Sequence, residues 1–471
     1  MPGPRLTFLG AAGTVTGSRF VLETGASPSS SQVLVDCGLF QGVKSIRKRN
    51  REPFGFPPRE LDAVVLTHAH IDHSGYLPAL CRDGYSGAIH CTPATADLAE
   101  LLMEDSARIQ QEDARYANRK GFSKHSPALP LYTVEDAIQA GEQLSTAPFD
   151  RWFPVAKGVD VRFRRAGHII GSALVETKVW EGDGEAVRVL FSGDVGRYDA
   201  PLVPDPTAPS DCDVLVVEST YGDRSHPTEP VEEQLRGILE RGAERGSTIV
   251  FASFAVGRAQ QLVYLLSKVM RETGRTIPIH LDSPMAANAT RIYRRYPEES
   301  GLETVSLRSG ASPVFGANVY VHREAEESKR LNDLPGPRVI IASSGMMTGG
   351  RVLHHLKRCL PNADDVVVLV GYQAPGTRGR RLQDREPTLR IHGRDHPVRA
   401  RIEQLSGLSA HADADELIRW LGDLPAPKRT FIVHGDDEAR EAFAARLTDE
   451  LGHSCVLPQH GETHHLLPDG A

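Results

Sequence analysis

Three imidazoles and one carboxylate fall within six residues of this chain: His68, His70, Asp72 and His73. The run directly follows the apolar, β-branched segment Ala63–Leu66. A strand that ends in a tight turn can hold such groups close together and point them at one spot. Imidazole nitrogen and carboxylate oxygen are suitable ligands for Zn²⁺ and similar divalent ions. Because a metal at such a site can make hydroxide from water near neutral pH, the run points to hydrolysis.

Three further potential ligands each follow a β-branched or alternating segment that predicts a strand: Asp36, His168 and Asp194. Taken singly, each has an ordinary explanation, because an aspartate after a strand is usually a turn former or a helix cap. A Gly-His pair is likewise usually a turn. The histidine run at the end of an apolar strand is much harder to attribute to chance.

The pattern of predicted helices and strands changes along the rest of the chain. Thr92 and Pro93 predict a helix start, with threonine as the N-cap and proline in the first turn. From about Asp213 the pattern becomes repeated strand, loop and helix units, and Thr248–Ala252 with the helical segment through Leu266 is one of them. This rhythm predicts a parallel sheet covered by helices, with ligands beyond the carboxyl ends of the strands.

Together, Asp36, the run from His68 to His73, His168 and Asp194 resemble the ordered motifs of the metallo-β-lactamase superfamily. Three later segments resemble the additional motifs of its β-CASP branch: Glu218, His411 and His434. In that branch a second domain is inserted into the lactamase fold. The helix-and-strand block 225–391 has the size and position of that insertion.

The resemblance implies an α/β fold. The expected architecture is a metallo-β-lactamase αββα sandwich with an inserted β-CASP domain, which contains a mainly parallel sheet flanked by helices. The expected parts are a first lactamase segment, the inserted domain and a C-terminal lactamase segment, at 1–224, 225–391 and 392–471. Because the chain ends soon after His434, it also looks like the compact bacterial form of the family.

The resemblance also implies two zinc ions per chain. The ligands expected for the first ion are His68, His70 and His168. The ligands expected for the second are Asp72, His73 and His434. Asp194 would bridge the ions, and Asp36 would orient either the attacking hydroxide or a ligand histidine. Whether zinc or manganese is the physiological metal is left open.

His411 is the expected general acid, with Glu218 fixing its tautomer and keeping it protonated by charge pairing. The alternative for His411 is a structural histidine buried in a turn. Together with the ligand Asp72, the residues expected to serve catalysis are Asp36, Glu218 and His411. The implied reaction is hydrolysis of a phosphodiester by metal-activated hydroxide, which leaves 5′-phosphate and 3′-hydroxyl ends.

Candidate substrate-binding residues lie in the expected insertion: Ser343, Ser344, Gly345, Ser253, Arg258, Arg378 and Arg380. Backbone N–H groups and hydroxyls in the 343–345 loop, between a strand and a helix, can cradle a phosphate. The segment from Thr377 to Arg401 contains eight arginines and only three acidic residues, although the whole chain carries a net charge of −7. A Gly-rich turn and a solvated surface stretch are the alternatives for these two features.

The expected function is that of a zinc-dependent ribonuclease that acts on single-stranded RNA in processing or decay. In the DNA-acting branch of the family the last motif is usually valine, so His434 favours RNA; a DNA nuclease and an inactive RNA-processing scaffold are the alternatives. Endonuclease and 5′-exonuclease modes, and a homodimer, are left open. No apolar run approaches bilayer-spanning length and no signal peptide is evident, so a cytoplasmic protein without membrane contact is expected.

Overall fold

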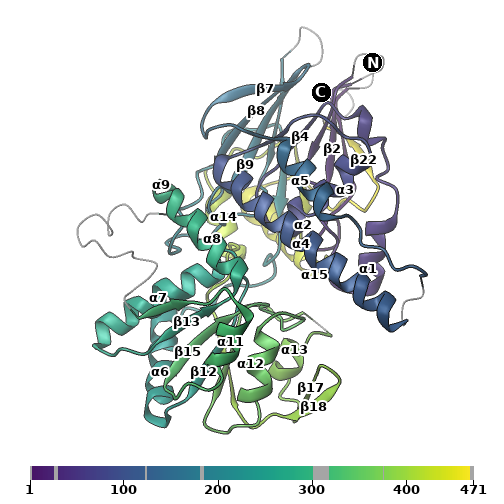
Figure 1. Cartoon of the computed structure of the whole chain (residues 1–471). Helices are drawn as coiled ribbons and strands as arrows, with labels where there is room; N and C mark the ends of the chain where they lie inside the picture. The colour runs from purple at the N-terminus through teal and green to yellow at the C-terminus, as the bar shows by residue number, and fades with distance from the viewer. Residues whose placement is uncertain are drawn as a thin grey trace. The chain divides into compact units, whose positions relative to one another are not determined.

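The computed structural model describes residues 3–25, 30–121, 125–180, 185–300, 318–374 and 376–466. Contacts between residues divide the chain into two compact units. Unit 1 consists of Met1–Ala200, Pro204–Ser225 and His411–Ala471, and unit 2 consists of Pro201–Val203 and His226–Ala410. The helices and strands of both units are labelled in Figure 1.

The first sheet of unit 1 has seven strands in the order β22-β1-β2-β3-β4-β5-β6. Their bounds are β1 (Arg5–Phe8), β2 (Phe20–Glu23), β3 (Gln32–Val35), β4 (Ala63–Val65), β5 (Ile89–Cys91), β6 (Leu144–Thr146) and β22 (Thr463–His465). The strands from β22 to β3 pair antiparallel, whereas those from β3 to β6 pair in parallel. β3 and β4 therefore end side by side at the same edge.

The second sheet of unit 1 also has seven strands, in the order β21-β20-β11-β10-β9-β8-β7. Their bounds are β7 (Trp152–Ala156), β8 (Val159–Arg165), β9 (Ala173–Val179), β10 (Val187–Phe191), β11 (Val214–Glu218), β20 (Arg429–Val433) and β21 (Cys455–Val456). The strands β7 to β10 pair antiparallel, and β10, β11, β20 and β21 pair in parallel. Every residue of β11 is buried, as expected of a parallel strand covered on both faces.

The two sheets of unit 1 share one apolar core. The Phe8 ring of the first sheet lies 4.9 Å from the Phe431 ring of the second, and Phe20 lies 6.1 Å from Phe191, measured between centroids. On its other face the second sheet packs against α14 (Ala414–Leu421) and α15 (Asp437–Leu451), chiefly through apolar side chains. Burial of this apolar surface is the main term that holds the layers together.

The 28-residue helix α4 (Pro93–Lys120) begins as the sequence predicts. The Thr92 hydroxyl accepts a hydrogen bond from the Thr95 N–H, and the helix ends at Gly121, which has the left-handed backbone of a C-terminal cap. The other helices of the first half are α1 (Lys44–Lys48), η1 (Arg49–Arg51), η2 (Pro58–Glu60), α2 (Ile71–Ser74), α3 (Leu77–Arg82) and α5 (Val134–Glu142). α4 packs against α2 and α5 and thereby supports the histidine run.

Unit 2 is built on a six-stranded sheet in the order β14-β13-β15-β12-β16-β19, and all of its pairings are parallel. The bounds are β12 (Thr248–Ala252), β13 (Ile279–Asp282), β14 (Val319–Val321), β15 (Arg338–Ala342), β16 (Val366–Val370) and β19 (Arg401–Leu405). β17 (Thr388–Ile391) and β18 (Arg394–Pro397) form a separate antiparallel hairpin. The sequence places the second boundary after residue 391, whereas the contacts extend unit 2 to Ala410, because β19 pairs with β16.

The helices of unit 2 are α6 (Val231–Arg245), α7 (Arg258–Thr273), α8 (Pro284–Arg295), α9 (Pro297–Ser300), α11 (Ala325–Leu331), α12 (Val352–Cys359) and α13 (Arg378–Gln383). α12 covers β12 and β16 and buries Val352, Leu356 and Cys359 against the sheet. The α/β class expected from the sequence is confirmed. Among the helices of the described ranges, none is long and apolar enough to cross a membrane.

Candidate metal centre

The candidate centre lies where the parallel strands of unit 1 end. Asp36 directly follows β3, and the run that begins at His68 follows the adjacent parallel strand β4. In the second sheet, three residues follow or end the parallel strands β10, β11 and β20: Asp194, Glu218 and His434. Because the carboxyl ends of parallel strands meet at one edge, each sheet presents these side chains together.

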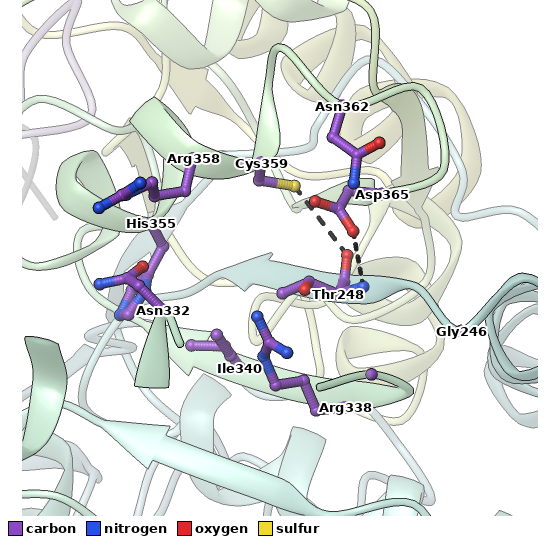
Figure 2. A pocket seen from close by; sticks show the side chains of 11 residues that line it. Gly246, Thr248, Asn332, Arg338, Ile340, His355, Arg358, Cys359, Asn362 and Asp365 are labelled. Carbon is purple, nitrogen blue, oxygen red and sulfur yellow. Dashed lines mark hydrogen bonds between the residues drawn. The ribbon is translucent and has the colours of Figure 1, made fainter. Parts of the chain in front are cut away.

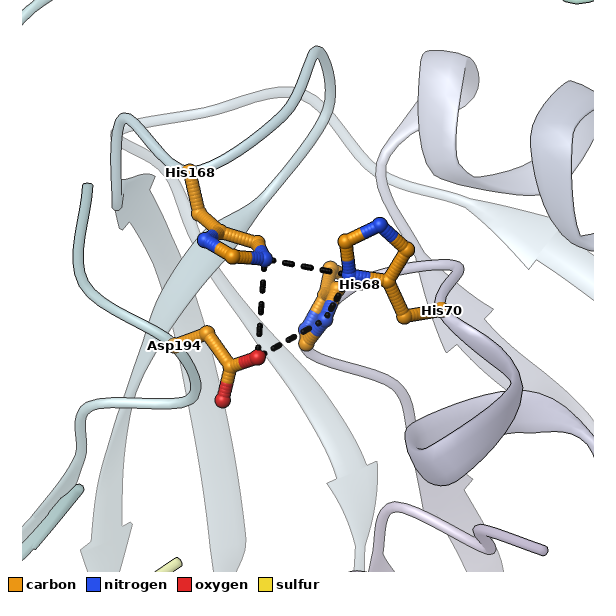
Figure 3. A group of neighbouring side chains, drawn as sticks. All are labelled: His68, His70, His168 and Asp194. Atoms are coloured by element: carbon orange, nitrogen blue, oxygen red, sulfur yellow. Dashed lines mark hydrogen bonds and ion pairs between the residues drawn. The ribbon is translucent and has the colours of Figure 1, made fainter. Parts of the chain in front are cut away.

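One group of potential ligands consists of His68, His70, His168 and Asp194, which point toward one another in Figure 3. The His70 Nδ1 atom lies 3.2 Å from His68 Nε2 and 3.0 Å from His168 Nε2. The Asp194 Oδ2 atom lies 3.4 Å from His68 Nε2 and 3.5 Å from His168 Nε2. Four side chains from three separate parts of the sequence thus converge on one point.

A second group consists of Asp72, His73 and His434. The Nε2 atoms of His73 and His434 are 3.3 Å apart, and His434 Nε2 lies 3.7 Å from Asp72 Oδ2. The short helix α2 separates the two halves of the run, because His70 precedes it whereas Asp72 and His73 lie within it. Its turn directs the second half of the run to a different group.

Asp194 connects the two groups. Its Oδ2 atom faces the first group, whereas its Oδ1 atom lies 3.2 Å from His73 Nε2 and 3.5 Å from His434 Nδ1. The side chain is buried, and within the described part of the chain Oδ1 has no hydrogen-bond donor. A buried carboxylate oxygen without a donor is costly unless a cation compensates it.

The donor set fits divalent metal ions. Zinc bonds to imidazole nitrogen and carboxylate oxygen are about 2.0–2.2 Å long, so tetrahedral ligands lie roughly 3.4 Å apart. In the first group, four of the separations between ligand atoms are 3.0 to 3.5 Å, and all are within 4.8 Å. Burial lowers the pKa of His68 to about 3 and that of His70 to about 4, so both rings are neutral near pH 7 and can offer a lone pair.

Asp36 is in direct contact with His73. The Asp36 Oδ2 atom lies 2.7 Å from His73 Nδ1, which leaves His73 Nε2 directed at the other ligands. Thr67 donates to Asp36 from its backbone N–H at 2.8 Å and from its hydroxyl at 2.9 Å. Such outer bonds fix the orientation and tautomer of a ligand imidazole. Of the two roles expected for Asp36, the geometry favours orientation of a histidine.

Two threonines at the site were missed by the sequence analysis. The Thr67 hydroxyl lies 3.1 Å from His68 Nδ1, and the Thr220 hydroxyl lies 3.0 Å from His434 Nδ1. The Thr220 hydroxyl also donates to Glu218 Oε2 at 2.6 Å. Both threonines stand within two positions of a candidate at a strand end, and that proximity is the signal that could have identified them.

His411 and Glu218 form a pair beside the ligand groups. His411 Nδ1 lies 3.0 Å from Glu218 Oε2, and His411 Nε2 lies 3.8 Å from Asp194 Oδ2. Burial alone would lower the pKa of His411, but the carboxylates of Glu218 and Asp194 raise it to about 9. The ring is therefore protonated at neutral pH, and its Nε2–H is turned toward the centre.

The backbone is strained at the edge that carries the site. Asp36 and His434 have φ angles of 60° and 50°, a left-handed conformation that non-glycine residues adopt at a cost of about 1–3 kcal/mol. Gly38 lies so close to the α2 turn that an added Cβ would be 1.7 Å from the Asp72 carbonyl oxygen. Packing at this edge therefore requires glycine beside the second ligand group.

Four substrate-binding candidates of unit 2 lie at the carboxyl edge of its own sheet. The Ser253 N–H donates to the Ala342 carbonyl, which joins the ends of β12 and β15. The Ser344 hydroxyl accepts hydrogen bonds from backbone N–H groups of its own loop, at 3.1 and 3.4 Å. The Ser343 hydroxyl donates to the Ser283 hydroxyl at 3.3 Å, and Gly345 packs closely against the Phe254 ring.

The arginine candidates of unit 2 are placed differently from one another. Arg258 opens α7 at the carboxyl edge of the sheet. Arg378 donates to the carbonyl of Arg390 at 2.9 Å and to those of Met347 and Thr348 at 3.2 Å. Arg380 forms an exposed pair with Asp384, four residues along α13, at 3.0 Å. These contacts hold loops and a helix, and none of them points to a ligand.

Comparisons with known proteins agree with the geometry. Family models match the metallo-beta-lactamase superfamily at residues 28–231, the Beta-Casp domain at 259–382 and the Zn-dependent metallo-hydrolase RNA specificity domain at 395–458. Ribonuclease TTHA0252 of Thermus thermophilus is 38% identical over 97% of this chain and 99% of its own length. The transcription termination factor FttA of Methanosarcina mazei is 31% identical over 95% of this chain and 69% of its own length.

The fold and the ligand groups define a metal-dependent hydrolase with the metallo-β-lactamase fold. The chain belongs to the β-CASP family of that superfamily, as its motifs predicted. A solved structure of a protein of unknown function from Enterococcus faecalis aligns with a TM-score of 0.54 at 14% identity, covering 98% of this chain and 99% of that one. At that identity the likeness shows the fold alone.

Proposed function

We propose that the protein is a zinc-dependent ribonuclease that hydrolyses single-stranded RNA in cytoplasmic processing or decay. The observation that carries the proposal is the convergence of seven potential metal ligands beside the His411–Glu218 pair. Relatives named as a ribonuclease and as a transcription termination factor support RNA as the substrate class. The match to an RNA specificity domain supports it further.

Two zinc ions per chain are proposed. The first would be held by His68, His70 and His168, and the second by Asp72, His73 and His434, with Asp194 shared between them. Bound zinc would supply the Lewis acidity that activates water and offsets the negative charge developing on a phosphodiester. The two oxygens of Asp194, each facing a different histidine group, support the shared position.

His411 is proposed to protonate the leaving group. If the products carry a 5′-phosphate and a 3′-hydroxyl, the leaving atom is the O3′ oxygen, which needs a proton. His411 Nε2–H can donate it, because Nδ1 is held by Glu218 and Nε2 is turned toward the ligand groups. Glu218 is a positioning residue that fixes the tautomer of His411, as Asp36 fixes that of His73.

A basic segment of unit 1 is proposed to bind the RNA backbone. Five cations fall on α1 and η1: Lys44, Arg47, Lys48, Arg49 and Arg51. Within the described residues none of them forms an ion pair, and the exposed Lys44, Arg47 and Lys48 are available to phosphates. Arg51 donates to the Leu129 carbonyl, and Arg49 lies over the Phe40 ring. In unit 2 the candidates remain the 343–345 loop with Ser253, Arg258, Arg378 and Arg380, supported chiefly by the position of the loop at a carboxyl sheet edge.

The alternatives have less support. His434, which lies 3.3 Å from His73, supplies a ligand where DNA-acting relatives usually have valine. An inactive scaffold would be expected to lack ligands, whereas this chain keeps all seven in two groups joined by Asp194.

The test is a metal analysis combined with a cleavage time course. The purified protein should contain about two zinc ions per chain and cut 5′-labelled and 3′-labelled single-stranded RNA, with single-stranded DNA of the same sequence as control. End analysis should find 5′-phosphate and 3′-hydroxyl termini. Preferential cleavage of the DNA would contradict the substrate, and full activity after removal of all metal would contradict the mechanism. RNA with a 5′-triphosphate separates endonuclease from 5′-exonuclease action.

A further inference from the structure

A cavity of about 340 Å³ lies within unit 2, away from the carboxyl ends of its strands. Its walls come from the starts of β12 and β15, the segment before β16, Asn332 at the end of α11, and the helix α12. The volume is at the lower end of the range for small-molecule sites. Figure 2 shows the space between these elements, with the Arg338 guanidinium pointing into it.

Arg338 brings a buried positive charge to this cavity. The residue is 8% exposed, and within the described ranges no carboxylate lies within 4.0 Å of its guanidinium. One nitrogen donates to the Leu334 carbonyl, whereas Nε has no acceptor. The Asp365 carboxylate on the same wall offsets part of this charge from beyond ion-pair distance, and the guanidinium can still pair with a bound anion.

Arg358 adds a second cation to the wall. It is exposed on α12, and no ion pair or side-chain hydrogen bond joins it to another described residue. Arginine binds phosphate oxygens with two parallel N–H groups. Two guanidinium groups on one small cavity therefore favour a phosphate group.

The remaining polar wall supplies acceptors. Asn332 and Asn362, which line the cavity, carry amide oxygens that can accept hydrogen bonds. Among the described residues that line the cavity, Asp365 is the one acidic residue, and it accepts the Thr248 N–H at 2.8 Å. Its negative charge repels an anion that carries no hydrogen-bond donor. A ligand that fits must therefore present hydroxyl donors as well as a phosphate.

We propose that this cavity binds a small phosphorylated molecule that carries hydroxyl groups, of the sugar phosphate or nucleotide type. Its phosphate lies against Arg338 and Arg358, and its hydroxyls donate to Asp365. Sugar phosphates and nucleotides share this chemistry, because both can contain a ribose 5-phosphate unit. The site is independent of the metal centre, because every lining residue belongs to unit 2.

Calorimetric titration of the full-length protein with ribose 5-phosphate, AMP, inorganic phosphate and sulfate tests the proposal. Ribose 5-phosphate and AMP should bind more tightly than inorganic phosphate, and sulfate should bind most weakly. Tighter binding of AMP would identify a nucleotide site, and equal binding a sugar phosphate site. Absence of binding by all four probes at millimolar concentration, or equal binding of sulfate and ribose 5-phosphate, would overturn the proposal.

Substitutions at the cavity test whether the phosphorylated ligand binds there. Arg358→Ala is exposed and should weaken binding about tenfold or more, because it removes a charge-assisted hydrogen bond, whereas the exposed Arg399→Ala outside the cavity should not. Arg338→Met should abolish binding and melt no lower than the unliganded wild type, because it removes an unpaired buried charge. If Arg338→Met fails to fold, Arg358→Ala decides alone.

Phosphates could also bind at the metal centre, and Asp194→Ala separates the two sites. Binding that persists in Asp194→Ala and falls in Arg358→Ala supports the cavity. Binding that is lost in Asp194→Ala and unchanged in Arg358→Ala would overturn it. Because these titrations need no RNA cleavage, the proposal stands or falls separately from the ribonuclease activity.

Discussion

The side chains at the strand ends of unit 1 and those at the strand ends of unit 2 have different partners. In unit 1 the polar groups beyond β4 and β10 face one another, as His68 faces Asp194 at 3.4 Å. In unit 2 the polar groups beyond β12 and β15 form hydrogen bonds within the unit's own loops and strand ends. Ser344 accepts two N–H groups of the turn that follows it, and Ser343 donates to Ser283. Similar positions on parallel strands therefore serve ligand binding in one unit and loop structure in the other.

The difference has an energetic consequence. The unit 1 groups are costly without a ligand, because Asp194 Oδ1 is buried without a donor. The left-handed backbones of Asp36 and His434 add strain at the same edge. The unit 2 groups already contribute to stability through local hydrogen bonds. Substitutions in unit 1 should therefore change activity more than stability, and those in unit 2 the reverse.

The largest effect is expected from Asp194→Ala. Loss of the shared ligand should remove most bound metal and reduce RNA cleavage on the order of 10³-fold or more, because several kcal/mol of charge stabilisation is lost. Metal analysis and single-turnover cleavage measure both. The matched control is Asp213→Asn, at the opposite end of β11, where the carboxylate accepts only structural bonds such as the Arg188 N–H at 2.9 Å. Normal metal content in Asp194→Ala would contradict the proposal that the strand ends of unit 1 bind metal whereas those of unit 2 hold loops.

His411→Ala tests the proton donor. Cleavage should fall by about 10²- to 10⁴-fold, because general acid catalysis is lost, while metal content stays the same. Glu218→Gln should give a smaller loss, since His411 remains but its positive charge is no longer paired across 3.0 Å. If His411→Ala also loses metal, the ring belongs to the ligand set and the proposed division of roles is wrong.

Asp36→Asn tests the hydrogen bond that orients the candidate ligand His73. We expect metal affinity to fall by about 10- to 100-fold, because the amide cannot hold His73 Nδ1–H as the carboxylate does at 2.7 Å. Competition with a chelator measures the change, and excess metal should restore cleavage. A loss of cleavage that excess metal leaves uncorrected would instead favour the role of Asp36 in orienting hydroxide.

The combined change of Lys44, Arg47 and Lys48 to alanine tests the basic segment of unit 1. Each cation that no longer neutralises a phosphate of single-stranded RNA should reduce the slope of log affinity against log salt by about 0.7, so three should reduce it by about 2. Binding at several salt concentrations measures this, with a metal-free protein so that no cleavage occurs. An unchanged slope would show that the RNA backbone does not run along α1.

The sequence points to the candidate ligands of the two groups for a local reason. His68, His70, Asp72 and His73 are adjacent in the chain, so an apolar strand and one turn suffice to bring them together. The partners of these ligands were harder to predict. Thr220 meets His434 across 214 residues, and that contact depends on the parallel pairing of β11 with β20.

The end of the inserted domain is at residue 391 in the sequence prediction and at Ala410 in the division by contacts. The segment that becomes β19 is short and rich in charge, and nothing local assigns it to either unit. Its place is decided by pairing with β16, more than thirty residues earlier in the chain. In unit 2 the Gly-rich loop was correctly placed between a strand and a helix, but its sequence could not reveal that the Ser344 hydroxyl is already engaged.

The smallest effect is expected from Ser344→Ala, and it tests the unit 2 side of the comparison directly. Its hydroxyl accepts the N–H groups of Thr348 and Gly349, so the change should lower the free energy of unfolding by about 1 kcal/mol. RNA affinity should change less than in the triple variant of α1, because the hydroxyl is bonded within its own loop. Chemical denaturation and RNA binding measure the two quantities. A large loss of affinity with unchanged stability would mean that this loop binds phosphate, and the contrast between the two units would then no longer hold.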